Sequence, residues 1–116
     1  MGASAFTDTV IGKYKSTQEA FNCAVEDAAH EHGHGGYTGT IAEKTSFKMV
    51  TCPPRVSPYK FAEKCIDNEE HFLSDKWGPA GCIEYTGAYL KKLKERCGHK
   101  GERGIRAFIF FGWASE

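Results

Sequence analysis

The arrangement of hydrophobic and polar positions predicts one long helix near the N-terminus. Apolar side chains recur at the i, i+3, i+4, i+7 spacing of a helical face, at Phe21, Ala24, Val25 and Ala28. Ser16 and Glu19 form a capping box, which starts helices, and a glycine-rich stretch after residue 32 provides a helix end. The pattern therefore predicts a helix over 17–32, with His32 continuing its apolar face.

Other segments have the composition of strands. An alternating pattern over 3–11 predicts a strand, and β-branched and aromatic residues over 37–50 predict one long strand or two consecutive ones. A short strand is expected around 82–85. Residues 105–113 form the most apolar segment, and their nearly continuous hydrophobicity predicts a central strand that is covered on both faces.

Two further helices complete the expected set of elements. Ser57 followed by Pro58 is a favourable helix start, and an apolar stripe follows at Phe61, Ala62, Cys65 and Ile66. Residues 89–96 also have helical spacing. The resulting order predicts an α+β fold, with a mostly antiparallel sheet of about four strands and two or three helices packed on it. A parallel doubly wound sheet ranks second, because no glycine-rich phosphate loop connects a strand to a helix.

Length and composition indicate a single domain over residues 1–116. A chain of 116 residues with 41% hydrophobic and 26% charged residues has ordinary globular proportions. No segment has the pattern of a membrane span or a signal peptide, so a cytoplasmic location is expected. The five cysteines include no CxxC pair, which favours reduced thiols and argues against a zinc site. We expect neither a metal nor a cofactor.

Charge is balanced overall but unevenly distributed along the chain. The net charge is zero, with 15 basic and 15 acidic side chains. Residues 19–32 carry four acidic residues and no Lys or Arg, whereas basic groups dominate 91–106, at Lys91, Lys92, Lys94, Arg96, Lys100, Arg103 and Arg106. This asymmetry indicates either a surface that attracts anions or an ordinary solvated helix face and loop.

The first candidate site is the segment 31–44, which reads EHGHGGYTGTIAEK. Histidines and glycines alternate at its start, and glycines let a ligand approach the backbone closely. Histidine acts as an acid or base near neutral pH, and Glu43 would orient it. The alternative is a helix C-cap with histidines favourably placed against the helix dipole, followed by an ordinary turn.

The second candidate comprises the segments DKWGPAGC, residues 75–82, and FFGWASE, residues 110–116. Trp77 and Trp113 each neighbour a glycine, an arrangement that leaves an indole face open for stacking. Tryptophans beside turns also serve as core anchors. Both interpretations stay open for Trp77, and the core is favoured for Trp113.

The strings HGGYTGTIAEK, DKWGPAGC and FFGWAS resemble those of small proteins encoded in tailed-phage genomes and bacterial prophage regions. The resemblance runs from the first helix to the C-terminus and fits least well over 89–106. It implies a setting, the cytoplasm of a host cell, and no particular catalytic residues. Short phage accessory proteins often inhibit a host protein or sequester a ligand used in host defence.

Three hypotheses of function follow from these features. The first is a binding protein, expected to be a homo-oligomer, that sequesters an anionic small molecule or nucleotide. Its expected ligand-binding residues are His34, Gly36, Tyr37, Lys44, Trp77, Arg103 and Arg106. The second is an inhibitor that binds a host protein. The third is a small enzyme with an acid–base site, whose expected catalytic residues are His32, His34, Tyr37 and Glu43.

Overall fold

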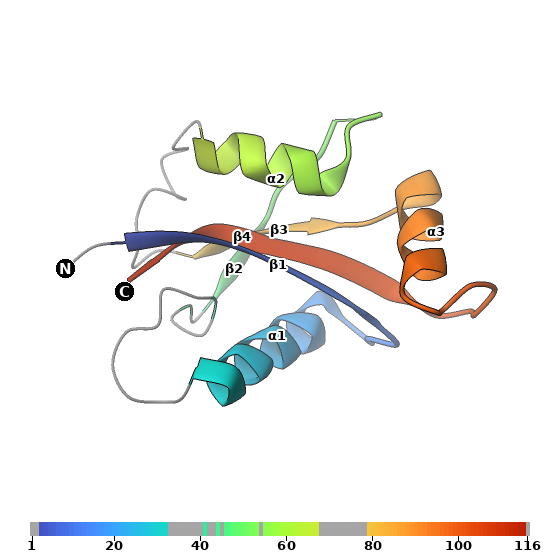
Figure 1. Cartoon of the computed structure of the whole chain (residues 1–116), viewed down its shortest axis with the longest axis horizontal. Helices are drawn as coiled ribbons and strands as arrows, with labels where there is room; N and C mark the ends of the chain where they lie inside the picture. The colour runs from blue at the N-terminus through green and yellow to red at the C-terminus, as the bar shows by residue number, and fades with distance from the viewer. Residues whose placement is uncertain are drawn as a thin grey trace.

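A computed structural model describes residues 3–32, 41, 44, 46–53, 55–67 and 79–115 of the chain (Figure 1). Four strands and three helices lie in these residues, and together they form an α+β fold. In chain order they are β1 (Ala3–Gly12), α1 (Thr17–His32), β2 (Phe47–Met49), α2 (Pro58–Asp67), β3 (Ala80–Glu84), α3 (Gly87–Arg96) and β4 (Arg106–Ser115).

The strands form one mixed sheet in the order β1-β4-β3-β2. β1 pairs with β4 antiparallel over its whole length, from Ala3 opposite Ser115 to Gly12 opposite Arg106. β3 also pairs with β4 antiparallel, and β2 runs parallel to β3. The sheet is therefore mostly antiparallel, as the element order predicted, and β4 is an inner strand as its apolar sequence predicted.

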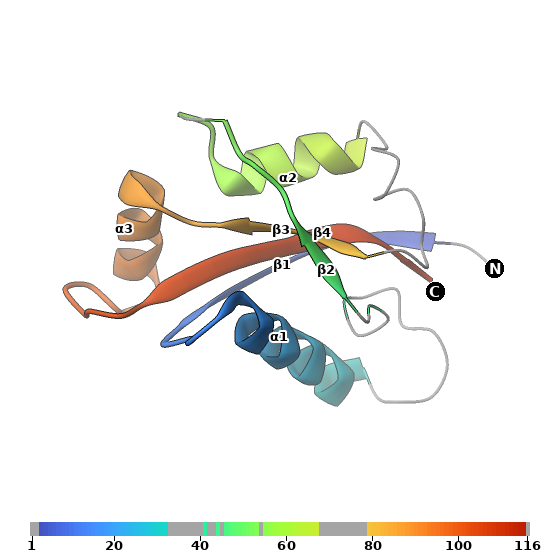
Figure 2. The same cartoon turned by 180° about the vertical axis from the view of Figure 1, so that it is seen from behind.

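Helices cover both faces of this sheet (Figures 1 and 2). Side chains alternate along β4, so that Phe108 and Phe110 join the core beneath α1, whereas Ile109 and Phe111 join the core beneath α2 and α3. All four of these side chains are fully buried. Their alternation explains why the segment reads as continuously hydrophobic.

The helix expected over 17–32 is confirmed, and its start has the expected cap. The backbone N–H of Glu19 donates to Oγ of Ser16 at 3.2 Å, and the Glu19 carboxylate accepts from the N–H of Lys15 at 3.3 Å. The predicted helices at 58 and 89 are also present, the latter beginning two residues earlier, at Gly87.

The strand expected over 37–50 requires a correction only at its described positions, because residues 37–40, 42, 43 and 45 lie outside the described residues. In the part of this segment that the structure describes, only Phe47–Met49 forms a strand. The N–H of Lys44 instead donates to the carbonyl of Ile41 at 2.9 Å, which is a turn, and the side chain of Ile41 is buried in the core beneath α1. The β-branched residue therefore contributes a core contact and no strand pairing.

Candidate functional site

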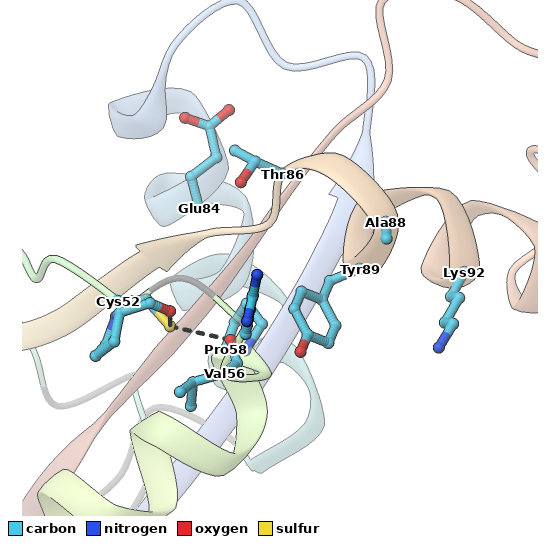
Figure 3. Close-up of a pocket in the computed structure, with 10 residues that line it drawn as sticks. Cys52, Val56, Pro58, Glu84, Thr86, Ala88, Tyr89 and Lys92 are labelled. Carbon is cyan, nitrogen blue, oxygen red and sulfur yellow. Dashed lines mark hydrogen bonds between the residues drawn. The ribbon is translucent and has the colours of Figure 1, made fainter.

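A pocket of about 480 Å³ lies between the start of α2 and the start of α3 (Figure 3). The loop before α2, the end of β3 and the first turn of α3 form its walls. We call it the α2–α3 pocket. The residues that matter for its chemistry are Cys52, Arg55, Glu84, Thr86, Tyr89 and Lys92.

Both helices direct their N-terminal ends toward this pocket, which is lined by Pro58 at the start of α2 and by Thr86 and Ala88 at the start of α3. Neither helix has an acidic residue in its first turn, and Thr86, the N-cap of α3, makes no side-chain capping hydrogen bond. The first N–H groups of a helix carry partial positive charge when nothing caps them. The start of α3 therefore favours a negatively charged group in the pocket, and the first turn of α2 places no carboxylate there to oppose one.

Two cationic side chains add to this field. Arg55 and Lys92 line the pocket, and neither forms an ion pair with another residue that the structure describes. The carboxylate of Glu84 is already paired with Arg106, through Nε at 3.1 Å and Nη2 at 3.3 Å. Since Glu84 is balanced in this way, the remaining charge of the pocket is positive.

The backbone of Arg55 has an uncommon conformation. Its φ angle is +66°, in the left-handed region that side chains other than glycine rarely occupy. Such a residue costs about 1–2 kcal/mol relative to the ordinary conformation. Strained residues of this kind concentrate at functional sites, and this one places an arginine at the pocket.

The thiol of Cys52 is held in its protonated form at neutral pH. Sγ donates a hydrogen bond to the carbonyl of Val56 at 3.3 Å (Figure 3), and burial raises the pKa of the thiol above its ordinary value. A protonated thiol is a poor nucleophile. The pocket therefore offers positive charge and hydrogen-bond donors, rather than an activated attacking group.

Several of the residues expected to form a site lie outside those the structure describes. These are His34, Gly36, Tyr37, Glu43 and Trp77, and the side chain of His32 belongs with them. Trp113 is described, and it packs against the core beneath α2 and α3, in agreement with the favoured interpretation of that residue.

The structure does not bring Lys44 together with Arg103 and Arg106. Lys44 is only 3% exposed and precedes β2, which begins at Phe47, opposite the first residue of β3. Arg106 begins β4 near the last residue of β3, where it pairs with Glu84 and also lies over the ring of Phe108. Arg103 is exposed in the loop before β4. Lys44 therefore precedes the strand that pairs with the start of β3, whereas Arg103 and Arg106 lie together where β4 begins, near the end of β3.

Sequence reasoning found only one part of the α2–α3 pocket. Lys92 belongs to the basic segment whose charge indicated an anion-binding surface. Arg55, Thr86 and Tyr89 were missed, because their roles depend on two helix ends that meet in space. The absence of Asp and Glu from the first turns of both helices is the signal that would have indicated them.

Comparison with known proteins gives no assignment, since no protein family, curated protein or solved structure matches the chain. Within the described ranges, no group of three or more His, Cys, Asp or Glu side chains is placed to hold a metal ion. None of the described helices is long and apolar enough to span a membrane. The geometry of the α2–α3 pocket is thus the basis for a functional proposal.

Proposed function

We propose that this protein binds an anionic small molecule in the α2–α3 pocket and holds it without converting it. The observation that carries the proposal is that two helix N-termini lacking acidic residues meet at a pocket that also contains Arg55 and Lys92. A phosphate or carboxylate there would accept hydrogen bonds from the first N–H groups of α3 and would neutralise the two side chains.

The size and walls of the pocket support a small organic anion. Its volume of about 480 Å³ lies within the ordinary range for ligand sites. Val56, Pro58 and the ring of Tyr89 line it as well (Figure 3). These apolar surfaces would contact the uncharged body of a ligand while its anionic group lies at the helix ends.

Binding is favoured over catalysis by the state of the reactive groups. The raised pKa of Cys52 keeps its thiol protonated, and the carboxylate of Glu84 is engaged by Arg106. The thiol is thus not activated as a nucleophile, and the carboxylate already has a partner within the protein. Sequestration of a host metabolite also suits the phage setting that the sequence resemblance implies, with the host cytoplasm as the place of action.

The test uses inorganic pyrophosphate as the probe and isothermal titration calorimetry as the measurement. We expect Lys92→Ala to weaken binding about tenfold, the effect of removing one charge-assisted contact. The matched control is Lys91→Ala, which removes the same charge from the neighbouring position of α3 without altering the lining of the pocket. Equal losses in the two variants, or no binding by the unaltered protein, would overturn the proposal.

Arg55→Gly provides a second variant with a distinct signature. Glycine adopts a φ of +66° without strain. The strain energy that is relieved roughly offsets the greater backbone entropy that glycine loses on folding, so the free energy of unfolding should stay within ~1 kcal/mol of that of the unaltered protein. Binding of pyrophosphate should nevertheless weaken, because the guanidinium is gone. A variant that keeps both its stability and its affinity would show that Arg55 takes no part in binding.

A further inference from the structure

A second hollow adjoins the α2–α3 pocket along α3. Its volume is about 240 Å³, and it shares Tyr89 and Lys92 with the pocket, so the two lie on either side of these residues. Tyr59 and Lys60 from the first turn of α2 and Arg96 from the last turn of α3 also line it. We call it the Tyr59 hollow.

The Tyr59 hollow extends the positive charge of the pocket. Lys60, Lys92 and Arg96 line it, and no carboxylate is found among its described lining residues. Neither Lys60 nor Arg96 forms an ion pair within the part of the chain that the structure describes. From Gly87 to Arg96, α3 rises about 14 Å at 1.5 Å per residue. The cations and helix N–H groups therefore extend over a greater length than a single phosphate group can contact.

An exposed aromatic ring accompanies these cations. Tyr59 is 46% exposed, although most large hydrophobic side chains of the described residues are covered. Tyr85 and Tyr89 line the same hollow. Aromatic rings among cations along a groove are the arrangement with which proteins hold unpaired nucleotides, because bases stack on the rings while phosphates contact the cations.

We propose that the anion bound here is a nucleotide chain with at least two phosphates, one at the helix ends of the α2–α3 pocket and one at Lys60 and Arg96, with a base against Tyr59. This inference rests on the proposed function, since it extends the same site. The chemistry is shared by a free dinucleotide and by a single-stranded nucleic acid, and ligand length separates the two.

The experiment compares AMP with the 5′-phosphorylated dinucleotide pApA by calorimetry on the full chain. We expect pApA to bind at least tenfold more tightly than AMP. The salt dependence of its affinity should be steeper by about 0.7 in the log–log slope, the value for one additional phosphate contact. An eight-nucleotide strand that binds no more tightly than pApA would indicate a free dinucleotide as the ligand, and tighter binding would indicate a single strand.

Substitutions in the Tyr59 hollow should weaken the binding of pApA and leave the binding of AMP unchanged. Lys60→Ala and Arg96→Ala should reduce the affinity for pApA to about that for AMP, and the affinity for AMP should not change. Tyr59→Ala should weaken pApA binding roughly 5- to 100-fold, whereas Tyr59→Phe should retain it. The matched controls are Lys64→Ala on α2 and Lys91→Ala on α3, which remove the same charge outside both hollows.

Failure of this inference differs from failure of the proposed function. If AMP and pApA bind equally and Lys60→Ala has no effect, the nucleotide chain is excluded and the pocket still binds anions. If pyrophosphate, AMP and pApA all fail to bind, the proposed function itself fails. A poly-glutamate peptide that binds more tightly than pApA would overturn the nucleotide assignment in favour of an acidic protein segment.

Discussion

The first turns of α1 and α3 both follow a residue with a side-chain hydroxyl, but only the hydroxyl before α1 makes a capping hydrogen bond. Ser16 caps α1 by accepting from the N–H of Glu19, and the Glu19 carboxylate accepts from the N–H of Lys15, just before the cap. Thr86 precedes α3, makes no capping hydrogen bond and is followed at the corresponding position by Tyr89. The difference leaves first-turn N–H groups of α3 without a side-chain cap, which is the feature that the proposed anion binding uses.

The same contrast extends to the two faces of the sheet. Beneath α1, the rings of Phe21, Phe47 and Phe110 lie with their centroids 5.1–5.9 Å apart. Such packing of aromatic rings stabilises a core beyond the burial of area. The face beneath α2 and α3 instead has the α2–α3 pocket and the Tyr59 hollow beside its core. Stability should therefore depend most on the α1 face, and binding on the other.

The largest expected effect follows from removing a ring on the α1 face. Phe110→Ala should lower the free energy of unfolding by about 3–5 kcal/mol, because it leaves a cavity among fully buried rings. Urea unfolding monitored by circular dichroism measures the loss. Lys92→Ala is the comparison on the other face and should change stability by less than about 0.5 kcal/mol. Similar losses in the two variants would remove the distinction between the faces.

Removal of the two cap residues should have unequal effects. Ser16→Ala should destabilise the protein by about 1 kcal/mol, because the N–H of Glu19 loses its partner. Thr86→Ala should cost much less, because the Thr86 hydroxyl makes no capping hydrogen bond. Urea unfolding of both variants checks this prediction, and equal losses would contradict the view that the start of α3 is uncapped.

A modest gain in stability should come from giving the first turn of α3 the acidic residue that it lacks. Ala88→Glu places a carboxylate in the first turn, which should stabilise the protein by about 0.3–1 kcal/mol. Pyrophosphate binding should weaken at least tenfold, because the new carboxylate repels the anion and competes for the same N–H groups. Ala88→Gln is the uncharged control. Unchanged binding by Ala88→Glu would show that the ligand lies elsewhere.

Local sequence patterns predicted most of the fold because helix periodicity, capping and strand hydrophobicity depend on residues that are close together in the chain. The extent of α1 follows from the period of its apolar residues and from the Ser16 capping box. The inner position of β4 follows from its unbroken hydrophobicity. The same reasoning was wrong at Ile41, because β-branched residues also occur in turns whose side chains are buried in the core.

The candidate site was much less predictable from the chain. Arg106 was expected to bind a ligand, and the structure shows that it also pairs with Glu84, which lies 22 residues earlier in the sequence. Arg55, which was not predicted, faces the same pocket as Lys92. A charged residue in the sequence does not show whether its partner will be a ligand or another side chain, since that choice depends on distant residues.

The sequence by itself determined the α+β class, the extent of α1, the helix start at Pro58 and the inner strand, because periodicity, capping and hydrophobicity act over a few neighbouring residues. Only the tertiary structure decided that the ends of α2 and α3 meet, that Glu84 is neutralised and that Lys44 lies apart from Arg103 and Arg106. The physical reason is that a pocket and its charge arise from contacts between segments far apart in the chain, which the packing of helices on the sheet brings together.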